Sequence, residues 1–100
     1  MEMFYHIVMM RFSEAADAAF FKRAEDYCVR IRAECAGVRD YFMAPNLADR
    51  SDGLTHAVVA LCDSSAAHDA YQVSAAHQEM KAFMAGYITR IVVYDGGPQA

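Results

Sequence analysis

Apolar residues recur along the chain with two different periods, which predict strands in some segments and helices in others. Four stretches are short, apolar and rich in β-branched or aromatic residues, as strands are: residues 3–12, 38–45, 54–62 and 87–95. After the first, apolar side chains recur at helical spacing from Ser13, a candidate N-cap, to about Ala36, where Gly37 would end the helix. The first half of the chain therefore predicts a strand, a long helix and two further strands.

The second helical segment, from Ser64 or Ser65 to about Ala85, contains an interruption. The helical pattern stops near Val73–Ala75 and then resumes. We therefore expect two short helical pieces joined by a break, followed by the last strand.

The predicted order of elements is strand, helix, strand, strand, helix, strand, which is the split βαβ order of the ferredoxin-like fold. The expected class is α+β, a four-stranded antiparallel sheet with helices on one face, in a single domain of residues 1–100. Alternation along the strands puts His6 and His56 on one face, which we assign to the helices. The opposite face is also apolar and carries Tyr5, Ile7, Met9, Ala57, Val59 and Leu61. Because monomers rarely expose so much apolar surface, we expect a homodimer that packs two sheets through this outer face into an α/β barrel.

Composition and charge exclude several classes of partner. Lys and Arg number only nine and the formal net charge is −4, so no nucleic-acid partner is expected. No apolar run approaches the roughly 20 residues that span a bilayer, and Glu2 stands where a signal peptide would be positive. The three cysteines lack CxxC spacing and cannot all pair within the chain: Cys28, Cys35 and Cys62. These features predict a cytoplasmic protein with reduced, buried thiols and no membrane partner.

The candidate chemistry is a tyrosine and a histidine on either side of the predicted break. Tyr71 and His77 are six residues apart, and an unbroken helix at roughly 100° per residue would leave them about 120° from alignment. A break would let both face one space, which His6 and His56 would border from the sheet. Histidine suits proton transfer near neutral pH, and a tyrosine hydroxyl can donate to a developing enolate oxygen. The alternative is that each is a half-buried polar residue with a backbone partner.

Other polar residues carry weaker signals. His68 lies on the polar-looking side of its helix and is expected to be exposed. Asp95, at the end of the last strand, is a candidate either to orient His6 or His56 or to form a turn. A zinc site made from His6, His56 and His77 is conceivable, but no two of them have the spacing of a helical ligand pair. We therefore expect no metal site and no cofactor.

Four segments of the chain resemble the stress-responsive dimeric α/β-barrel (Dabb) family, over about residues 4–95: "YHIVMMRF", "GLTHAVVAL", "AYQVSAAHQEM" and "IVVYD". The more specific element is the tyrosine followed six residues later by His-Gln, together with the strand histidines. The family usually has His-Pro-Ala-His in the helix break, whereas this chain has Ser74 and Ala75 in place of the first histidine and the proline.

Within this family the best understood activity is that of plant polyketide cyclases of the olivetolic acid type, which close a linear polyketide by aldol condensation without a cofactor. The resemblance implies a pocket between the sheet and its own helices. In it His77 would be the base and Tyr71 would polarise a carbonyl, with His6 and His56 on the sheet floor. The apolar residues expected to contact the ligand are Val8, Met10, Phe21, Val58, Met80 and Val93.

Two classes of function follow from these features. One is a cofactor-independent cyclase or lyase acting on an apolar, carbonyl-bearing, polyketide-like molecule. The other is a non-catalytic, small-molecule-binding or stress-related dimer. A cavity of at least about 300 Å³ would favour a ligand site, whereas a filled interior would favour a purely structural protein.

Overall fold

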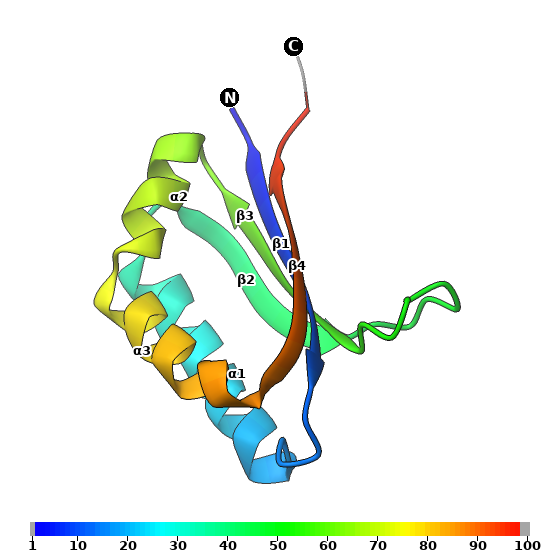
Figure 1. Cartoon of the computed structure of the whole chain (residues 1–100). Coiled ribbons are helices and arrows are strands. Elements are labelled where there is room, and N and C mark those ends of the chain that lie inside the picture. The colour runs from blue at the N-terminus through cyan, green and yellow to red at the C-terminus, as the bar shows by residue number, and fades with distance from the viewer. Residues whose placement is uncertain (1, 99–100) are drawn as a thin grey trace.

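The computed structural model describes residues 2–98, which form one sheet and a layer of helices (Figure 1). In chain order the elements are β1 (Phe4–Phe12), α1 (Ala18–Glu34), β2 (Val38–Pro45), β3 (His56–Cys62), α2 (Ser65–Gln72), α3 (Ala75–Met84), a short 3₁₀ helix (Ala85–Tyr87) and β4 (Ile88–Gly96). The strands pair antiparallel in the order β2-β3-β1-β4, and the helices cover one face of the sheet. The predicted ferredoxin-like α+β fold is confirmed. None of the helices within residues 2–98 is long and apolar enough to cross a membrane.

The start of α1 differs from the prediction. The backbone N–H of Ser13 donates to the carbonyl of Tyr87 at 2.8 Å, and the Ser13 carbonyl accepts from Ala16 at 3.1 Å, so the chain makes a turn here before the helix begins. Asp17 is the N-cap, because its Oδ1 accepts from the backbone N–H of Phe20 at 2.9 Å. The prediction of Ser13 as the cap is therefore wrong by four residues.

The core lies between the helices and the inner face of the sheet. Ala24, Cys28 and Ile31 follow one another at helical spacing on α1 and are almost completely buried. Full burial of an aliphatic side chain such as Ile31 contributes roughly 1.5–3 kcal/mol. The three cysteines are buried and carry no disulfide, as the sequence predicts.

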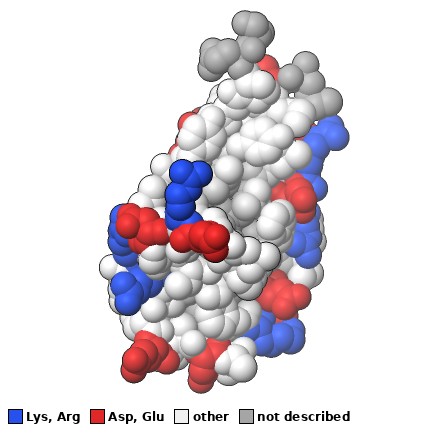
Figure 2. Space-filling view, turned by 90° about the vertical axis from the view of Figure 1, so that its right-hand side faces the viewer, with Lys and Arg blue, Asp and Glu red and all other residues white. Residues whose placement is uncertain are grey.

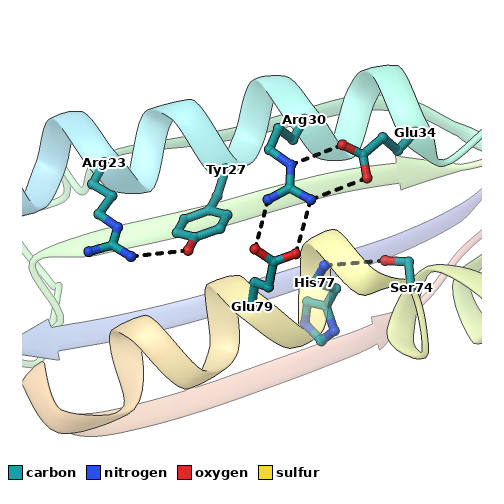
Figure 3. A network of polar contacts seen from close by, with 7 residues as sticks. All are labelled: Arg23, Tyr27, Arg30, Glu34, Ser74, His77 and Glu79. Carbon is teal, nitrogen blue, oxygen red and sulfur yellow. Dashed lines mark hydrogen bonds and ion pairs between the residues drawn. The ribbon is translucent and has the colours of Figure 1, made fainter.

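An exposed ion-pair network joins α1 to α3 (Figure 3). The guanidinium of Arg30 on α1 donates to both carboxylate oxygens of Glu79 on α3, at 3.0 and 3.1 Å, and also to Glu34 at 2.9 Å. The ring of His77, two residues before Glu79, leaves α3 in a different direction from this bridge. The network therefore holds α3 beside α1 without occupying the side of α3 that carries His77.

The face of the sheet opposite the helices carries apolar side chains that remain accessible in the single chain. Ile7 pairs with Val59 on one side and Tyr94 on the other, and Phe42 pairs with Val59, so one apolar row crosses all four strands. Tyr94 and Phe42 are 54% and 41% exposed. Figure 2, which views the right-hand side of Figure 1, shows a large continuous area without charged side chains. This is the face that the sequence predicts to be covered by a second copy of the chain.

Candidate functional site

A cavity of about 420 Å³ lies between the inner face of the sheet and α3. Ile91 and Val93 of β4 line it and are still about half exposed, so the cavity opens along β4. Its volume lies within the range of small-molecule sites, which begins at roughly 300 Å³. The walls are mainly apolar and are formed by Val8, Met10, Val58, Met80, Met84, Ile88, Ile91 and Val93.

The break between α2 and α3 brings Tyr71 and His77 together at this cavity. Ser74 is the N-cap of α3, and its Oγ accepts from the backbone N–H of His77 at 3.2 Å (Figure 3). The two ring centroids are 4.3 Å apart, and both side chains line the cavity. The predicted break is confirmed, and Ser74 has a structural role in it as the cap that starts the second helical piece.

A backbone carbonyl determines which nitrogen of His77 carries the proton. Nδ1 of His77 lies 3.0 Å from the carbonyl oxygen of Gln72, which can only accept, so Nδ1–H donates and the neutral ring keeps a lone pair on Nε2. Burial lowers the pKa of His77 below its usual value; the Gln72 carbonyl acts in the opposite direction, and His6, Lys81 and His68 lower this pKa further. The ring is therefore mainly neutral at pH 7, with Nε2 available as a base.

The hydroxyl of Tyr71 is paired with that of a second tyrosine, which is not among the site residues predicted from the sequence. Tyr71 is 1% exposed, and its hydroxyl lies 2.9 Å from that of Tyr41 on β2. Tyr41 can give its single proton either to the Tyr71 oxygen or to Sδ of Met80, at 3.6 Å. When Tyr41 donates to Tyr71, the Tyr71 proton is free for an acceptor in the cavity. Burial raises the pKa of both tyrosines, so both stay protonated at neutral pH.

His6, Asp95 and His68 meet at one end of the sheet. The pairing of β1 with β4 sets His6 opposite Asp95, and Nδ1–H of His6 donates to Asp95 Oδ1 at 2.5 Å. Of the two partners considered for Asp95, the structure therefore selects His6 and not His56. His68 is only 4% exposed and its ring centroid is 4.6 Å from that of His6. The expectation of an exposed His68 is wrong because it lies one helical turn before Tyr71, on the face of α2 that packs against the sheet.

His56 lies away from the cavity, contrary to expectation. It pairs with Met10, four residues along β1 from His6, and four strand residues span roughly 13 Å. The His56 ring stacks on Phe21, with centroids 4.6 Å apart, and its Nδ1 lies 2.9 Å from Oγ1 of Thr55. Neither His56 nor Phe21 lines the cavity. The predicted residues that do are His6, Tyr71, His77, Val8, Met10, Val58, Met80 and Val93.

Comparisons with known proteins agree with this architecture. The family model described as Stress responsive A/B Barrel Domain (Dabb) matches residues 4–96. A dimeric ferredoxin-like protein of unknown function from Jannaschia sp. CCS1 is 22% identical with a TM-score of 0.84, over 96% of this chain and 99% of that one. A hydroxynitrile lyase from Passiflora edulis is 20% identical with a TM-score of 0.82, over 94% and 91%. A Dabb family protein from Mesorhizobium loti is 16% identical with a TM-score of 0.81, over the full length of both chains. Among curated proteins, no match is found.

Proposed function

Because this chain belongs to the stress-responsive A/B barrel (Dabb) family, we propose that it is a small enzyme of the lyase or cyclase class that acts on an apolar, carbonyl-bearing molecule. The observation that carries the proposal is the state of His77. Its Nδ1–H is held by the Gln72 carbonyl, so a neutral ring presents an unprotonated Nε2 beside Tyr71 at the cavity. A base and a hydrogen-bond donor at one apolar cavity are the groups that enolisation of a ketone requires.

The proposed reaction begins with proton transfer from carbon. Nε2 of His77 removes a proton from the carbon next to a carbonyl, and the electron pair of that C–H bond moves onto the carbonyl oxygen. The Tyr71 hydroxyl donates a hydrogen bond to this oxygen as its negative charge develops, while Tyr41 donates to Tyr71. In a cyclase, the enolate carbon would then attack a second carbonyl of the same molecule, and the proton on His77 would return to the new alkoxide.

The cavity walls support an apolar substrate. Methionine side chains from β1 and α3, Met10, Met80 and Met84, adapt their shape to a flexible ligand. The opening along β4, between Ile91 and Val93 and helix α3, would let an alkyl chain extend out of the cavity. A solved hydroxynitrile lyase with the same fold adds support, since it shows that a protein of this architecture can be a lyase.

A homodimer is part of the proposal. The outer sheet face has a row of apolar residues through all four strands, and similar structures from Jannaschia, Thermobifida and Bacteroides are described as dimeric. Packing of two such faces would remove this row from water and leave the cavity of each chain on the helix side of its own sheet.

Nitrogen NMR tests the state of His77 and the ligand site together. Long-range ¹H–¹⁵N spectra at pH 7 should show the His77 proton on Nδ1, and an apolar 1,3-diketone should shift the Nε2 resonance. His56, which lies outside the cavity, is the internal control and should not shift. A proton on Nε2 of His77 would contradict the proposed base, and unchanged His77 signals across diketones of different chain length would contradict a ligand site. Binding without any turnover would instead favour a ligand-binding dimer.

A further inference from the structure

His6, His68 and Asp95 form a second group of polar side chains beside the proposed catalytic pair. They come from three different elements, β1, α2 and β4, and one possible ligand atom from each lies within 4.8 Å of the other two. Neither the proposed base nor the proposed donor belongs to this group. We propose that His6, His68 and Asp95 bind one first-row transition-metal dication, of the Zn²⁺ or Fe²⁺ type.

The distances within the group lie close to those of a metal site. Asp95 Oδ1 is 2.5 Å from Nδ1 of His6 and 3.9 Å from Nε2 of His68. Ligand atoms about 2.0–2.1 Å from a tetrahedral zinc ion are roughly 3.3 Å from one another. The first pair must therefore open, and the second must close, by less than about 1 Å each. Small rotations of the Asp95 side chain can make both adjustments, because its carboxylate is partly exposed at the end of β4. The ligand nitrogens of His6 and His68 lie within 4.8 Å of each other, and small rotations of the two rings would bring them to the same separation of roughly 3.3 Å.

The protonation that the contacts imply also suits a metal. The Gln72 amide nitrogen lies 3.0 Å from Nε2 of His68 and 3.5 Å from Nδ1, and it can only donate, so the nearer nitrogen, Nε2, accepts with its lone pair. An ion at Nε2 would take the place of this hydrogen bond. On His6, an ion would replace the proton that Nδ1 now donates to Asp95. Burial of both histidines restricts the two rings to small rotations.

The donor set specifies the class of ion. Two imidazole nitrogens and one carboxylate oxygen are the ligands of catalytic zinc sites and of non-haem iron(II) sites, whereas calcium and magnesium prefer oxygen alone. His6 and Asp95 both line the cavity. The open coordination position would therefore face the cavity, where a water molecule or a substrate oxygen could complete the shell.

Metal titration of chelator-treated protein tests the proposal without any assay of activity. Zn²⁺ and Co²⁺ should bind with a stoichiometry of one ion per chain, measured by calorimetry and by elemental analysis after gel filtration. His68→Gln and Asp95→Asn should each weaken binding by about 100-fold or more, since even loss of an outer-shell partner costs 10–100-fold. His56→Gln, which changes a histidine outside the group, should bind as the wild type does. Co²⁺ bound at this site should show visible d–d absorption.

Two results would overturn the site. One is the absence of binding to wild-type protein by millimolar Zn²⁺; the other is binding that persists unchanged in His68→Gln and Asp95→Asn, which would place the ion elsewhere. If either variant fails to fold by circular dichroism, NMR of the wild type decides. Zn²⁺ should then shift the ring resonances of His6 and His68 and leave those of His56 in place, and shifts confined to His56 or to surface carboxylates would contradict the proposal. This test is independent of the proposed enolisation, because a chain that binds no metal can still use His77 and Tyr71.

Discussion

Removal of both hydroxyls of the Tyr41–Tyr71 pair should destabilise the protein by much less than the sum of the two single removals. The two oxygens are 2.9 Å apart, and both residues are at most 2% exposed. Tyr41→Phe leaves the Tyr71 hydroxyl without this partner, and Tyr71→Phe leaves the Tyr41 hydroxyl with only the weak acceptor Sδ of Met80, at 3.6 Å. A buried polar group that loses its partner costs roughly 1–3 kcal/mol. Because both residues line the cavity, water can reach the remaining hydroxyl, so we expect about 1–2 kcal/mol for each single change.

The double variant loses the same hydrogen bond only once and leaves no orphaned hydroxyl. Its cost should therefore be close to that of one single change, with a coupling energy of about 1–2 kcal/mol. Urea denaturation at one fixed protein concentration measures these values, because unfolding of a dimer depends on concentration. A parallel cycle of Tyr41→Phe with Tyr27→Phe is the control. The Tyr27 hydroxyl contacts Arg23 and not Tyr41, so the costs of these two changes should add. Costs for Tyr41 and Tyr71 that add to within about 0.3 kcal/mol would refute the pairing.

Three further results are expected. In light scattering the wild-type protein should have twice the 11.1 kDa chain mass. Val59→Asp should produce monomers or unfolded protein, because it places a carboxylate at the centre of the proposed interface. Val29→Asp, on the exposed side of α1, should leave the mass unchanged. Gly37→Ala should lower the free energy of unfolding by about 1–3 kcal/mol, because its Cβ would lie 2.4 Å from a Cβ atom on α2. The control Gly86→Ala, whose Cβ would have nothing within 4 Å, should change the free energy of unfolding by less than about 1 kcal/mol. Equal effects of the two substitutions would contradict the close approach at Gly37. Proton-transfer activity should be constant from pH 7 upward and fall on the acid side with a midpoint below 6.5, because the pKa of His77 is lowered; a midpoint above 6.5 would show that the ring is not buried as a neutral group.

Local patterns were sufficient to predict the fold. The apolar, aromatic-containing composition of residues 38–45 predicted β2 with the bounds that the structure has, and the gap in the helical pattern located the break between α2 and α3. Where the sequence failed, a distant contact decides the structure. Ser13 and Asp17 are both good N-caps, and the hydrogen bond from Ser13 to Tyr87 favours the second.

Only part of the candidate site was predicted, because contacts between residues distant in the sequence decide the rest. Alternation along a strand shows which face a residue occupies but not where the strand lies under a helix, so His6 and His56 were placed together although antiparallel pairing separates them. His68 looked exposed because of its polar neighbours in sequence, but Asp95 and His6, which bury it, come from strands far away in the chain. Tyr41 could be found only once the inner face of β2 was known.

The proposed function requires Nε2 of His77 to take a proton from the carbon beside a carbonyl. Exchange of the α-protons of an alkyl 1,3-diketone in D₂O, followed by ¹H NMR, measures this step without knowledge of the natural substrate. The protein should accelerate exchange over buffer, His77→Ala and Tyr71→Phe should each reduce the acceleration by roughly 10²-fold or more, and His56→Ala should retain it. Exchange no faster than in buffer for diketones that bind, or an undiminished rate in a folded His77→Ala variant, would contradict the role of His77 as the base.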